Sequence, residues 1–303
     1  MSDKSKYQAL NHKLPLFFKS WWLDAVCDGD WDYAVINEGN EILALWPFQM
    51  ERKLGFKILR NPLLTPYLGP LWISEREKQA DWIEVLWQQL PKSDFMQWSC
   101  VPEFEGKDFL SKLDILHKEK VTYFLDLNHT EVELWANLHT TRRNGIRKGE
   151  KELVISKSDF TIDEFIKSHS LSFENKGKKY PYSPSFLTNI TQAAKANKSC
   201  LCFTATDTNG KPQGVLWLAF DSNKMYYLLS TTTLDANRGT MALLTWNAIL
   251  EAKKMTLKIF DFEGSMDAGI ARFFQRFGGT KMSYDEFSIT TSPLWKLKSK
   301  LLG

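Results

Sequence analysis

Cysteine and histidine are scarce in this sequence. Its 303 residues include 4 Cys and 5 His. A chain of this length does not need disulfides to hold its core together. Neither residue type shows the spacing of a zinc site. We therefore expect no bound metal and a reducing compartment. The four cysteines are Cys27, Cys100, Cys200 and Cys202.

Long hydrophobic runs are also missing. No apolar stretch approaches the roughly 18–20 residues that span a bilayer. The opening stretch, MSDKSKYQALNHK, is polar and has no apolar segment of the signal-peptide kind. These absences predict a cytoplasmic protein without an integral membrane span. The formal net charge of +3 is too small to indicate nucleic acid binding unless basic residues cluster locally.

The remaining composition, 43% hydrophobic and 25% charged, is typical of a soluble globular protein with room for two domains. A pattern of three strands, preceded and followed by helices, occurs twice. The two sets of strands are 31–36, 41–50 and 56–60, and 199–206, 213–220 and 225–230. The helices expected around them are 15–26, 76–90, 162–173 and 240–254.

Each half then continues as strand, loop, helix and strand. Thr130 and Glu133 form a capping box that opens a new helix after the first half. The sequence therefore predicts an α/β protein of two domains, 1–128 and 129–303. Each domain is expected to contain a mixed sheet with an antiparallel meander and flanking helices.

This order of elements, in two copies, resembles the GNAT acyltransferase fold and its FemAB branch, which joins amino acids to peptidoglycan precursors. Four segments carry the resemblance: PLFFKSWWLDAVC (Pro15–Cys27), LTPYLGPLW (Leu64–Trp72), LHTTRRNGIRKGEK (Leu138–Lys151) and FDFEGSMDAGIARFFQRFG (Phe260–Gly278). The resemblance implies tandem GNAT-like domains and an activated acyl donor, acyl-CoA or aminoacyl-tRNA.

Two departures from the family pattern bear on the donor and the acceptor. The glycine turn that holds the CoA pyrophosphate in GNAT enzymes is represented only by DANRGTMALL, with Arg238, Gly239 and Ala242. The Arg-Phe-Lys motif of peptidoglycan-bridge enzymes reads Arg272-Phe273-Phe274, so the charge of the lysine is missing.

Asp261 and Glu263 are the main catalytic candidates. In a strand they would point the same way, at the carboxyl end where open α/β sheets bind ligands. A carboxylate there could accept the proton of an attacking amine or hold its ammonium group. The alternative is an ordinary strand-to-helix junction in which Ser265 is the N-cap and Asp267 faces the helix dipole.

A basic stripe is expected on a helix at Arg143, Arg147 and Lys151, with Arg142 and Lys148 beside it. Such a stripe would attract a phosphate-bearing substrate, or else it is a solvated helix face. The tail SPLWKLKSKLLG could form a weak membrane-surface helix or dock against the body of the protein.

The segment Arg238-Gly239-Thr240 opens the helix 240–254 with backbone N–H groups that could hold donor phosphates. Tyr227, together with Ser230, could protonate a leaving group, although strand tyrosines also serve as core. The basic loop around Lys176, Lys178 and Lys179 could cover a charged ligand or remain a plain exposed loop.

The function expected from these features is an N-acyltransferase that moves an acyl group from acyl-CoA to an amine in a cleft between the two domains. The acceptor would be a small molecule or a cell-wall precursor. The alternatives are an aminoacyl-tRNA-dependent transferase acting on a peptidoglycan precursor and a non-catalytic GNAT-like binding module.

Overall fold

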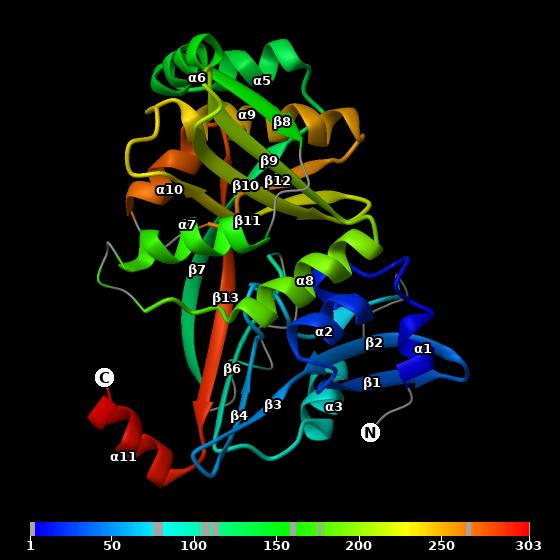
Figure 1. Cartoon of the computed structure of the whole chain (residues 1–303). Helices are drawn as coiled ribbons and strands as arrows, with labels where there is room; N and C mark the ends of the chain where they lie inside the picture. Colours follow the sequence, from blue (N-terminus) through cyan, green and yellow to red (C-terminus); the bar gives the residue numbers. More distant parts are fainter. Residues whose placement is uncertain are drawn as a thin grey trace. The chain divides into compact units, whose positions relative to one another are not determined.

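A computed structural model describes residues 4–74, 81–102, 104, 110, 115–157, 162–174, 177, 179–264 and 268–302. The chain forms two compact units (Figure 1). Residues 1–120 and 283–303 make up the first unit, and residues 121–282 make up the second. The strands β7 (Leu116–Asp126) and β13 (Thr280–Thr290) each begin in one unit and end in the other. The sequence predicts 129–303 as one domain, whereas in this division the last 21 residues group with the N-terminal unit.

The first unit contains short helices and two groups of strands. The helices described in it are α1 (Lys4–Gln8), the 3-10 helix η1 (Leu16–Phe18), α2 (Ser20–Val26), α3 (Trp82–Gln89) and α11 (Pro293–Leu302). Its strands are β1 (Asp32–Glu38), β2 (Glu41–Phe48), β3 (Met50–Lys53), β4 (Phe56–Arg60), β5 (Leu71–Trp72) and β6 (Phe95–Ser99). The order β1-β2-β5 forms a small sheet, and β3, β4, β6 and β13 are consecutive strands of a sheet with ten described strands.

The predicted first meander is therefore wrong in one respect. Its second strand, expected over 41–50, ends at Phe48, and Met50 begins β3 in the other sheet. Pro47 near the end of β2 has no N–H to donate to a neighbouring strand. The predicted helix 15–26 is likewise divided, because Lys19 has an extended backbone (ψ 136°) between η1 and α2.

The strands of the second unit belong to the same ten-stranded sheet and are covered by helices on both faces. In spatial order these strands are β7, β12 (Ile259–Asp261), β11 (Lys224–Thr232), β10 (Pro212–Phe220), β9 (Cys200–Asp207) and β8 (Leu153–Lys157). The pairs β8–β9, β9–β10, β10–β11 and β12–β7 are antiparallel, and β11–β12 is parallel. The predicted meander 199–230 is confirmed as β9–β11.

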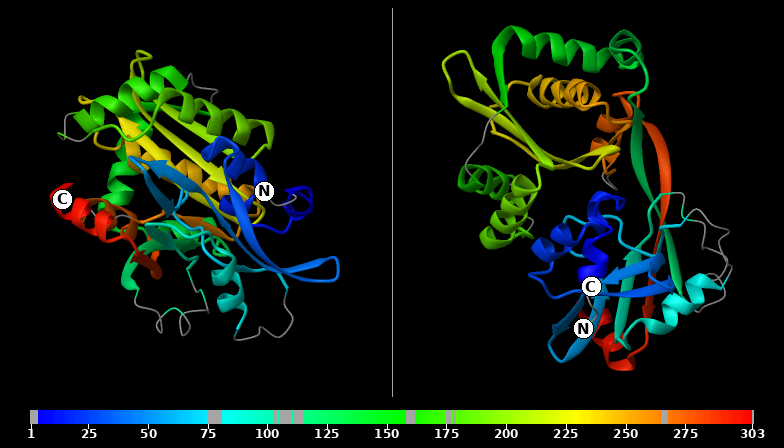
Figure 2. Two further views of the ribbon diagram at one scale, coloured as in Figure 1. Left: turned by 90° about the horizontal axis from the view of Figure 1, so that it is seen from below. Right: turned by 90° about the vertical axis from the view of Figure 1, so that its right-hand side faces the viewer.

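Six helices are described in the second unit. They are α5 (Glu131–Asn137), α6 (Thr140–Glu152), α7 (Ile162–Glu174), α8 (Pro184–Ala196), α9 (Thr240–Lys254) and α10 (Ala268–Gln275). Figure 2 shows α9 on one face of the sheet, with α6 beyond it, and α7 and α8 on the opposite face. The large hydrophobic core lies on the α9 side, where it includes residues of β7, β10, β11, α9 and α10. The α/β class predicted from sequence is confirmed.

The helix α8 was not predicted. It begins inside the segment that was interpreted as a loop, with Ser183 as N-cap and Pro184 in the first turn. The Ser183 hydroxyl accepts a hydrogen bond from the Phe186 N–H at 3.1 Å. This order, a capping serine followed by proline, is a typical helix start that the sequence already contained.

Candidate functional site

Asp261 is buried at the carboxyl end of β12. The short strand lies between β11 and β7, where Asp261 is paired with Tyr226 on one side and Phe124 on the other. Its Oδ1 oxygen accepts hydrogen bonds from the Thr122 hydroxyl at 2.6 Å and from the Glu263 N–H at 2.7 Å. Its side chain is fully inaccessible to solvent (0% exposed). Donors of this kind favour the ionised form of a buried carboxyl.

Glu263 is held beside Asp261 by a backbone turn. Glu263 has a φ of 59° and Gly264 a φ of 64°. A Cβ on Gly264 would lie 1.8 Å from the Val121 carbonyl oxygen, so the chain passes β7 too closely for any other residue. A left-handed backbone is uncommon at non-glycine residues. The instances that do occur are concentrated at functional sites.

The carboxyl group of Glu263 is strongly perturbed. The residue is partly exposed, but its Oε1 oxygen is buried and has no hydrogen-bond partner in the described part of the chain. Burial, and then the charge of Asp261, raise the pKa of Glu263 well above its ordinary value. A buried, unpartnered oxygen in a carboxylate pair is suited to bind a cation or to exchange a proton.

Tyr226 is the tyrosine next to this pair. It is the register partner of Asp261, and side chains alternate along a strand. The neighbouring Tyr227 therefore faces the other side, where its ring lies 5.3 Å from that of Phe274 in the core. Burial raises the pKa of Tyr227 to about 12. Strand pairing, which the sequence alone did not reveal, thus brings Tyr226 and not Tyr227 to the carboxylates.

The Tyr226 hydroxyl is engaged on its own face of the sheet. It donates to Asp221 Oδ2 at 3.1 Å. Burial, followed by the charges of Asp221 and Asp261, raises its pKa well above the ordinary value. Tyr226 thus stays neutral and adds no charge to the pair.

Tyr182, from the segment between α7 and α8, lies near Glu263. The charge of Glu263 contributes, after burial, to raising the pKa of Tyr182 to about 12. Tyr182 stacks on Phe186, and the Tyr180 hydroxyl lies 3.1 Å from His169 Nδ1. The segment predicted to be a basic lid is thus largely aromatic where it is described. Lys176 and Lys178, as well as Ser265 and Asp267, lie outside the described residues.

The predicted basic stripe lies on α6, but two of its arginines have structural contacts. Arg143 Nη1 donates to the carbonyl oxygens of Ala136 at 2.9 Å and Leu138 at 2.5 Å, so it caps the end of α5. The Arg147 guanidinium lies 5.6 Å from the centre of the Trp135 indole. These contacts account for both side chains without a ligand.

Arg142 lies over two aromatic rings. Its guanidinium is 4.4 Å from the Phe273 ring and 5.9 Å from the Phe277 ring. Burial, and then the charge of Arg276, lower its pKa. Its Nε atom is buried without a hydrogen-bond partner among the described residues. Arg276, which sequence reasoning missed, therefore adds a second positive charge beside Arg142.

The start of α9 is used for helix packing. The Gly239 N–H donates to Asn237 Oδ1 at 2.7 Å, and the Thr240 N–H donates to the Asn237 carbonyl at 2.9 Å. These two N–H groups, which we expected to be free for phosphate, are therefore occupied. A Cβ on Gly239 would lie 2.3 Å from the Gly145 carbonyl oxygen of α6. Gly239 thus lets the backbones of α6 and α9 meet.

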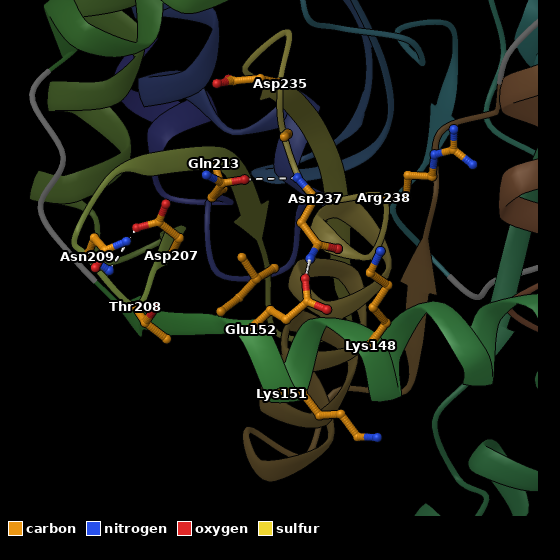
Figure 3. A pocket seen from close by; sticks show the side chains of 12 residues that line it. Lys148, Lys151, Glu152, Asp207, Thr208, Asn209, Gln213, Asp235, Asn237 and Arg238 are labelled. Atoms are coloured by element: carbon orange, nitrogen blue, oxygen red, sulfur yellow. Dashed lines mark hydrogen bonds between the residues drawn. The ribbon is translucent and has the colours of Figure 1, made fainter.

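A pocket of about 540 Å³ opens beside this helix start (Figure 3). Its cations are Lys148 and Lys151 from α6 and Arg238 from the loop before α9. In the described part of the chain these three side chains have no hydrogen-bond or ion-pair partner. In Figure 3, Lys148 rises from α6 toward the loop that carries Asn237 and Arg238.

The acidic groups of this pocket are already engaged. Glu152 Oε2 accepts a hydrogen bond from the Asn237 amide, and Asp235 pairs with Lys211. Asp207 Oδ1 accepts from the backbone N–H groups of Asn209 and Lys211, each at 2.9 Å. The three cations and the three carboxylates of the lining balance in number, so the pocket is near neutral overall, but its three cations, unpartnered among the described residues, suit a phosphate-bearing ligand.

No group of three or more His, Cys, Asp or Glu within the described ranges could hold a metal ion. No described helix has the length and apolar character that crossing a membrane requires.

The sequence of residues 136–275 matches the family model described as "Acetyltransferase (GNAT) domain". This range lies inside the second unit. Residues 136–275 are thus similar in sequence to GNAT domains. No curated protein sequence matches the chain.

Solved structures extend the likeness beyond this domain. FemX shares 13% identity at a TM-score of 0.74, with 98% of each chain covered. L-PGS from Bacillus licheniformis shares 12% identity at a TM-score of 0.58, covering 97% of this chain and 94% of its own. A tandem GNAT protein from the clavulanic acid biosynthesis pathway shares 10% identity at a TM-score of 0.52, covering 88% and 85%.

The predicted resemblance to FemAB-like proteins of the GNAT superfamily is confirmed by the domain match and the shared fold. The prediction of two tandem GNAT-like domains is likewise confirmed. The domain match also bears out the prediction of an enzyme of the acyl-transfer class.

Proposed function

We propose that the chain is an N-acyltransferase in which the Asp261–Glu263 pair binds and deprotonates the amine acceptor. The observation that carries this proposal is the buried, unpartnered Oε1 of Glu263 beside the buried Asp261. Two neighbouring carboxyl groups that are shielded from water favour the binding of a positively charged ligand. An alkylammonium group is such a ligand, and it must lose a proton before it can attack a carbonyl.

The proposed reaction proceeds in three steps. Ionised Glu263 accepts a proton from the ammonium group, which leaves a neutral amine with a free electron pair. The amine nitrogen attacks the acyl carbonyl carbon, and a carbon–nitrogen bond forms. The bond from the carbonyl carbon to the leaving sulfur or oxygen then breaks, and the second amine proton neutralises the leaving group. Protonated Glu263 returns its proton to solvent.

The raised pKa of Glu263 suits this role. A general base works best when its pKa is close to the operating pH, and a positioned base contributes roughly 10²–10⁴-fold to the rate. Asp261 has a supporting role, because its charge raises the proton affinity of Glu263. The two carboxyl groups thus have different roles. Asp261 supplies a fixed negative charge, and Glu263 accepts and releases the proton.

The donor phosphates are proposed to bind in the pocket of Figure 3. From Tyr226, the partner of Asp261, β11 continues for six residues to Thr232 at the approach to this pocket. At 3.3 Å per residue this is a path of about 20 Å. Acyl-CoA has phosphates at one end and its reactive thioester at the end of a long flexible arm, so it matches such a separation. Lys148, Lys151 and Arg238 would hold the phosphates.

Aminoacyl-tRNA is the second candidate donor. The FemAB resemblance favours it, since that branch uses amino acids attached to tRNA on cell-wall precursors. Arg142 and Arg276, which do not line the pocket, carry two further positive charges that would fit a longer phosphate backbone. In this alternative the same carboxylate pair serves the acceptor amine.

A melting experiment on the full chain distinguishes the donors. A ligand at 100 times its Kd stabilises the fold by about 2.7 kcal/mol, which is visible as a shift of Tm. We expect acetyl-CoA to raise the Tm, and the K148Q/R238Q variant to lose most of the shift. A shift with aminoacyl-tRNA alone would favour the FemAB-type alternative.

The Glu263→Gln variant separates an enzyme from a binding module. It keeps the shape of the side chain but cannot accept a proton. With the donor and acceptor that support transfer in the wild type, we expect donor binding to persist and turnover to fall by at least 10²-fold. Unchanged turnover in this variant would contradict the proposed role of Glu263. If donors and amines bind but no product forms with the wild type, the chain is a non-catalytic GNAT-like module.

A further inference from the structure

The C-terminal helix α11 is fixed to the first unit by one aromatic side chain. The Trp295 ring lies 5.2 Å from the Phe56 ring of β4 and stacks at 5.7 Å on the Phe95 ring of β6. The Lys298 ammonium group lies 5.0 Å from the centre of the Phe56 ring. Just before the helix, the Thr291 N–H donates to the Asp94 carbonyl at 3.0 Å. The orientation of α11 on this unit is thus defined.

This docking leaves the leucines of α11 in solvent. Leu294 is 69% exposed and Leu297 is 62% exposed. Their spacing of three places them on one side of the helix. An amphipathic helix on a globular protein normally turns its leucines toward the core. Here Trp295 occupies that position instead.

A third exposed leucine belongs to the neighbouring hairpin. Leu54, in the turn between β3 and β4, is 74% exposed with a φ of 53°. It is two residues from Phe56, which contacts Trp295. Figure 1 shows the β3–β4 turn and α11 at the same end of this unit. The three leucines therefore belong to one region of its surface.

Lysines lie beside these leucines. Lys53 is paired with Phe56, on the face of the hairpin that contacts Trp295, and Lys296 and Lys298 lie on the helix, whereas Arg52 and Lys57 alternate onto the other face of the hairpin. The nearby carboxylates are engaged: Glu51 pairs with Arg60 at 2.8 Å, and Asp94 Oδ2 accepts from the Lys57 N–H at 2.8 Å. We call Lys53, Lys296 and Lys298, together with Leu54, Leu294 and Leu297, the leucine–lysine surface.

We propose that the leucine–lysine surface binds the surface of an anionic phospholipid bilayer. Exposed leucines would enter the boundary between headgroups and acyl chains, while the lysines would contact the lipid phosphates. The composition argues against a protein partner, because the cores of protein interfaces are depleted in lysine. The proposal does not depend on the transfer reaction, since every residue in it belongs to the first unit and is distant in sequence from the carboxylate pair.

Vesicle co-sedimentation of the full chain tests this surface. Vesicles of equal parts phosphatidylglycerol and phosphatidylcholine should bind the wild type, and vesicles of phosphatidylcholine alone should bind it much less. The L294Q/L297Q variant should bind about tenfold or more weakly, because two partly buried leucines are lost. The Lys53→Gln variant should bind about fivefold more weakly, and binding should also weaken in high salt.

A matched control is Leu234→Gln, which removes a leucine that is 81% exposed in the second unit. It should bind the anionic vesicles like the wild type. All altered side chains are exposed, so an unchanged Tm checks the fold of each variant. Absence of binding to anionic vesicles would overturn the proposal, as would equal binding by L294Q/L297Q and the wild type. If L294Q/L297Q instead abolished self-association in solution, the surface would be an interface between copies of this chain.

Discussion

The backbone N–H of Glu263 donates a hydrogen bond to the side-chain oxygen Oδ1 of Asp261 at 2.7 Å. The bond is possible because Glu263 adopts a left-handed backbone and Gly264 follows it against β7. One turn therefore does two things. It helps to satisfy the buried Asp261, and it brings a second carboxyl group beside the first, where its pKa rises.

Replacing Glu263 should change how stability depends on pH. Its pKa is higher in the folded than in the unfolded state, so its contribution is fully present below the unfolded pKa, about 4.5. The contribution is lost as the pH rises through the folded pKa, because the buried group must then ionise. We expect the free energy of unfolding of Glu263→Gln not to show this decrease as the pH rises. Urea unfolding at pH 5 and pH 8 measures the difference.

Glu133 in the capping box of α5 gives a control of opposite sign. Hydrogen bonds from Thr130 lower the pKa of Glu133. Its contribution is present above the unfolded pKa and is lost as the pH falls. In Glu133→Gln, the decrease in the free energy of unfolding that Glu133 causes at acid pH should therefore be absent. The pH dependence on the alkaline side should be unchanged. Identical pH profiles for Glu263→Gln and the wild type would contradict a raised pKa at Glu263.

Gly264→Ala should prevent normal folding. The added Cβ would lie 1.8 Å from the Val121 carbonyl oxygen, and the residue needs a positive φ of 64°. A backbone clash of this kind belongs with the exceptional losses of more than about 4 kcal/mol. Gly210→Ala is the matched control, because Gly210 also has a positive φ, 81°, but nothing within 4 Å of the added Cβ. It should lose only about 1 kcal/mol. Thermal melting compares the two variants.

Gly239→Ala tests whether Gly239 serves packing or phosphate binding. The added Cβ would lie 2.3 Å from the Gly145 carbonyl oxygen and 2.9 Å from the Gly149 nitrogen, so α6 and α9 must separate. We expect a loss of several kcal/mol in the free energy of unfolding without any ligand present. A stable variant with weaker acetyl-CoA binding would show instead that Gly239 acts on the donor.

Substitutions of an arginine and of a lysine on α6 should differ in their effect on the free energy of unfolding. Arg143→Gln removes charged hydrogen bonds to the carbonyls at the end of α5 and should cost about 1–3 kcal/mol. Lys148→Gln, one turn further along, should change stability by no more than about 0.5 kcal/mol, since Lys148 points into the pocket. Urea unfolding measures both. Equal losses would mean that Lys148 also has a structural contact.

Local signals in the sequence predicted local structure well. The capping box of Thr130 and Glu133 is present as expected, with both reciprocal hydrogen bonds. The signal at Ser183-Pro184 was equally clear and was overlooked, because the nearby lysines suggested a loop. The spacing of Gly145 and Gly149, four residues apart in one helix, was also overlooked, and both glycines lie against the start of α9.

The candidate site could be predicted only in part. Asp261 and Glu263 were identified from their place at the end of a strand. Tyr226 could not be chosen over Tyr227, because that choice depends on which residue of β11 is paired with Asp261. Arg142, Arg143 and Lys148 look alike in the sequence, and they differ only through what lies opposite each one in the fold.

The most direct test of the carboxylate pair is a ¹³C NMR titration of the side-chain carboxyl groups, assigned by comparison with Glu263→Gln. It needs no substrate. We predict that Glu263 in the wild type titrates well above 4.5, and that Asp261→Asn lowers this pKa toward its ordinary value because a neighbouring negative charge is gone. A Glu263 pKa at or below 4.5 in the folded wild type would contradict its role as the base in this site.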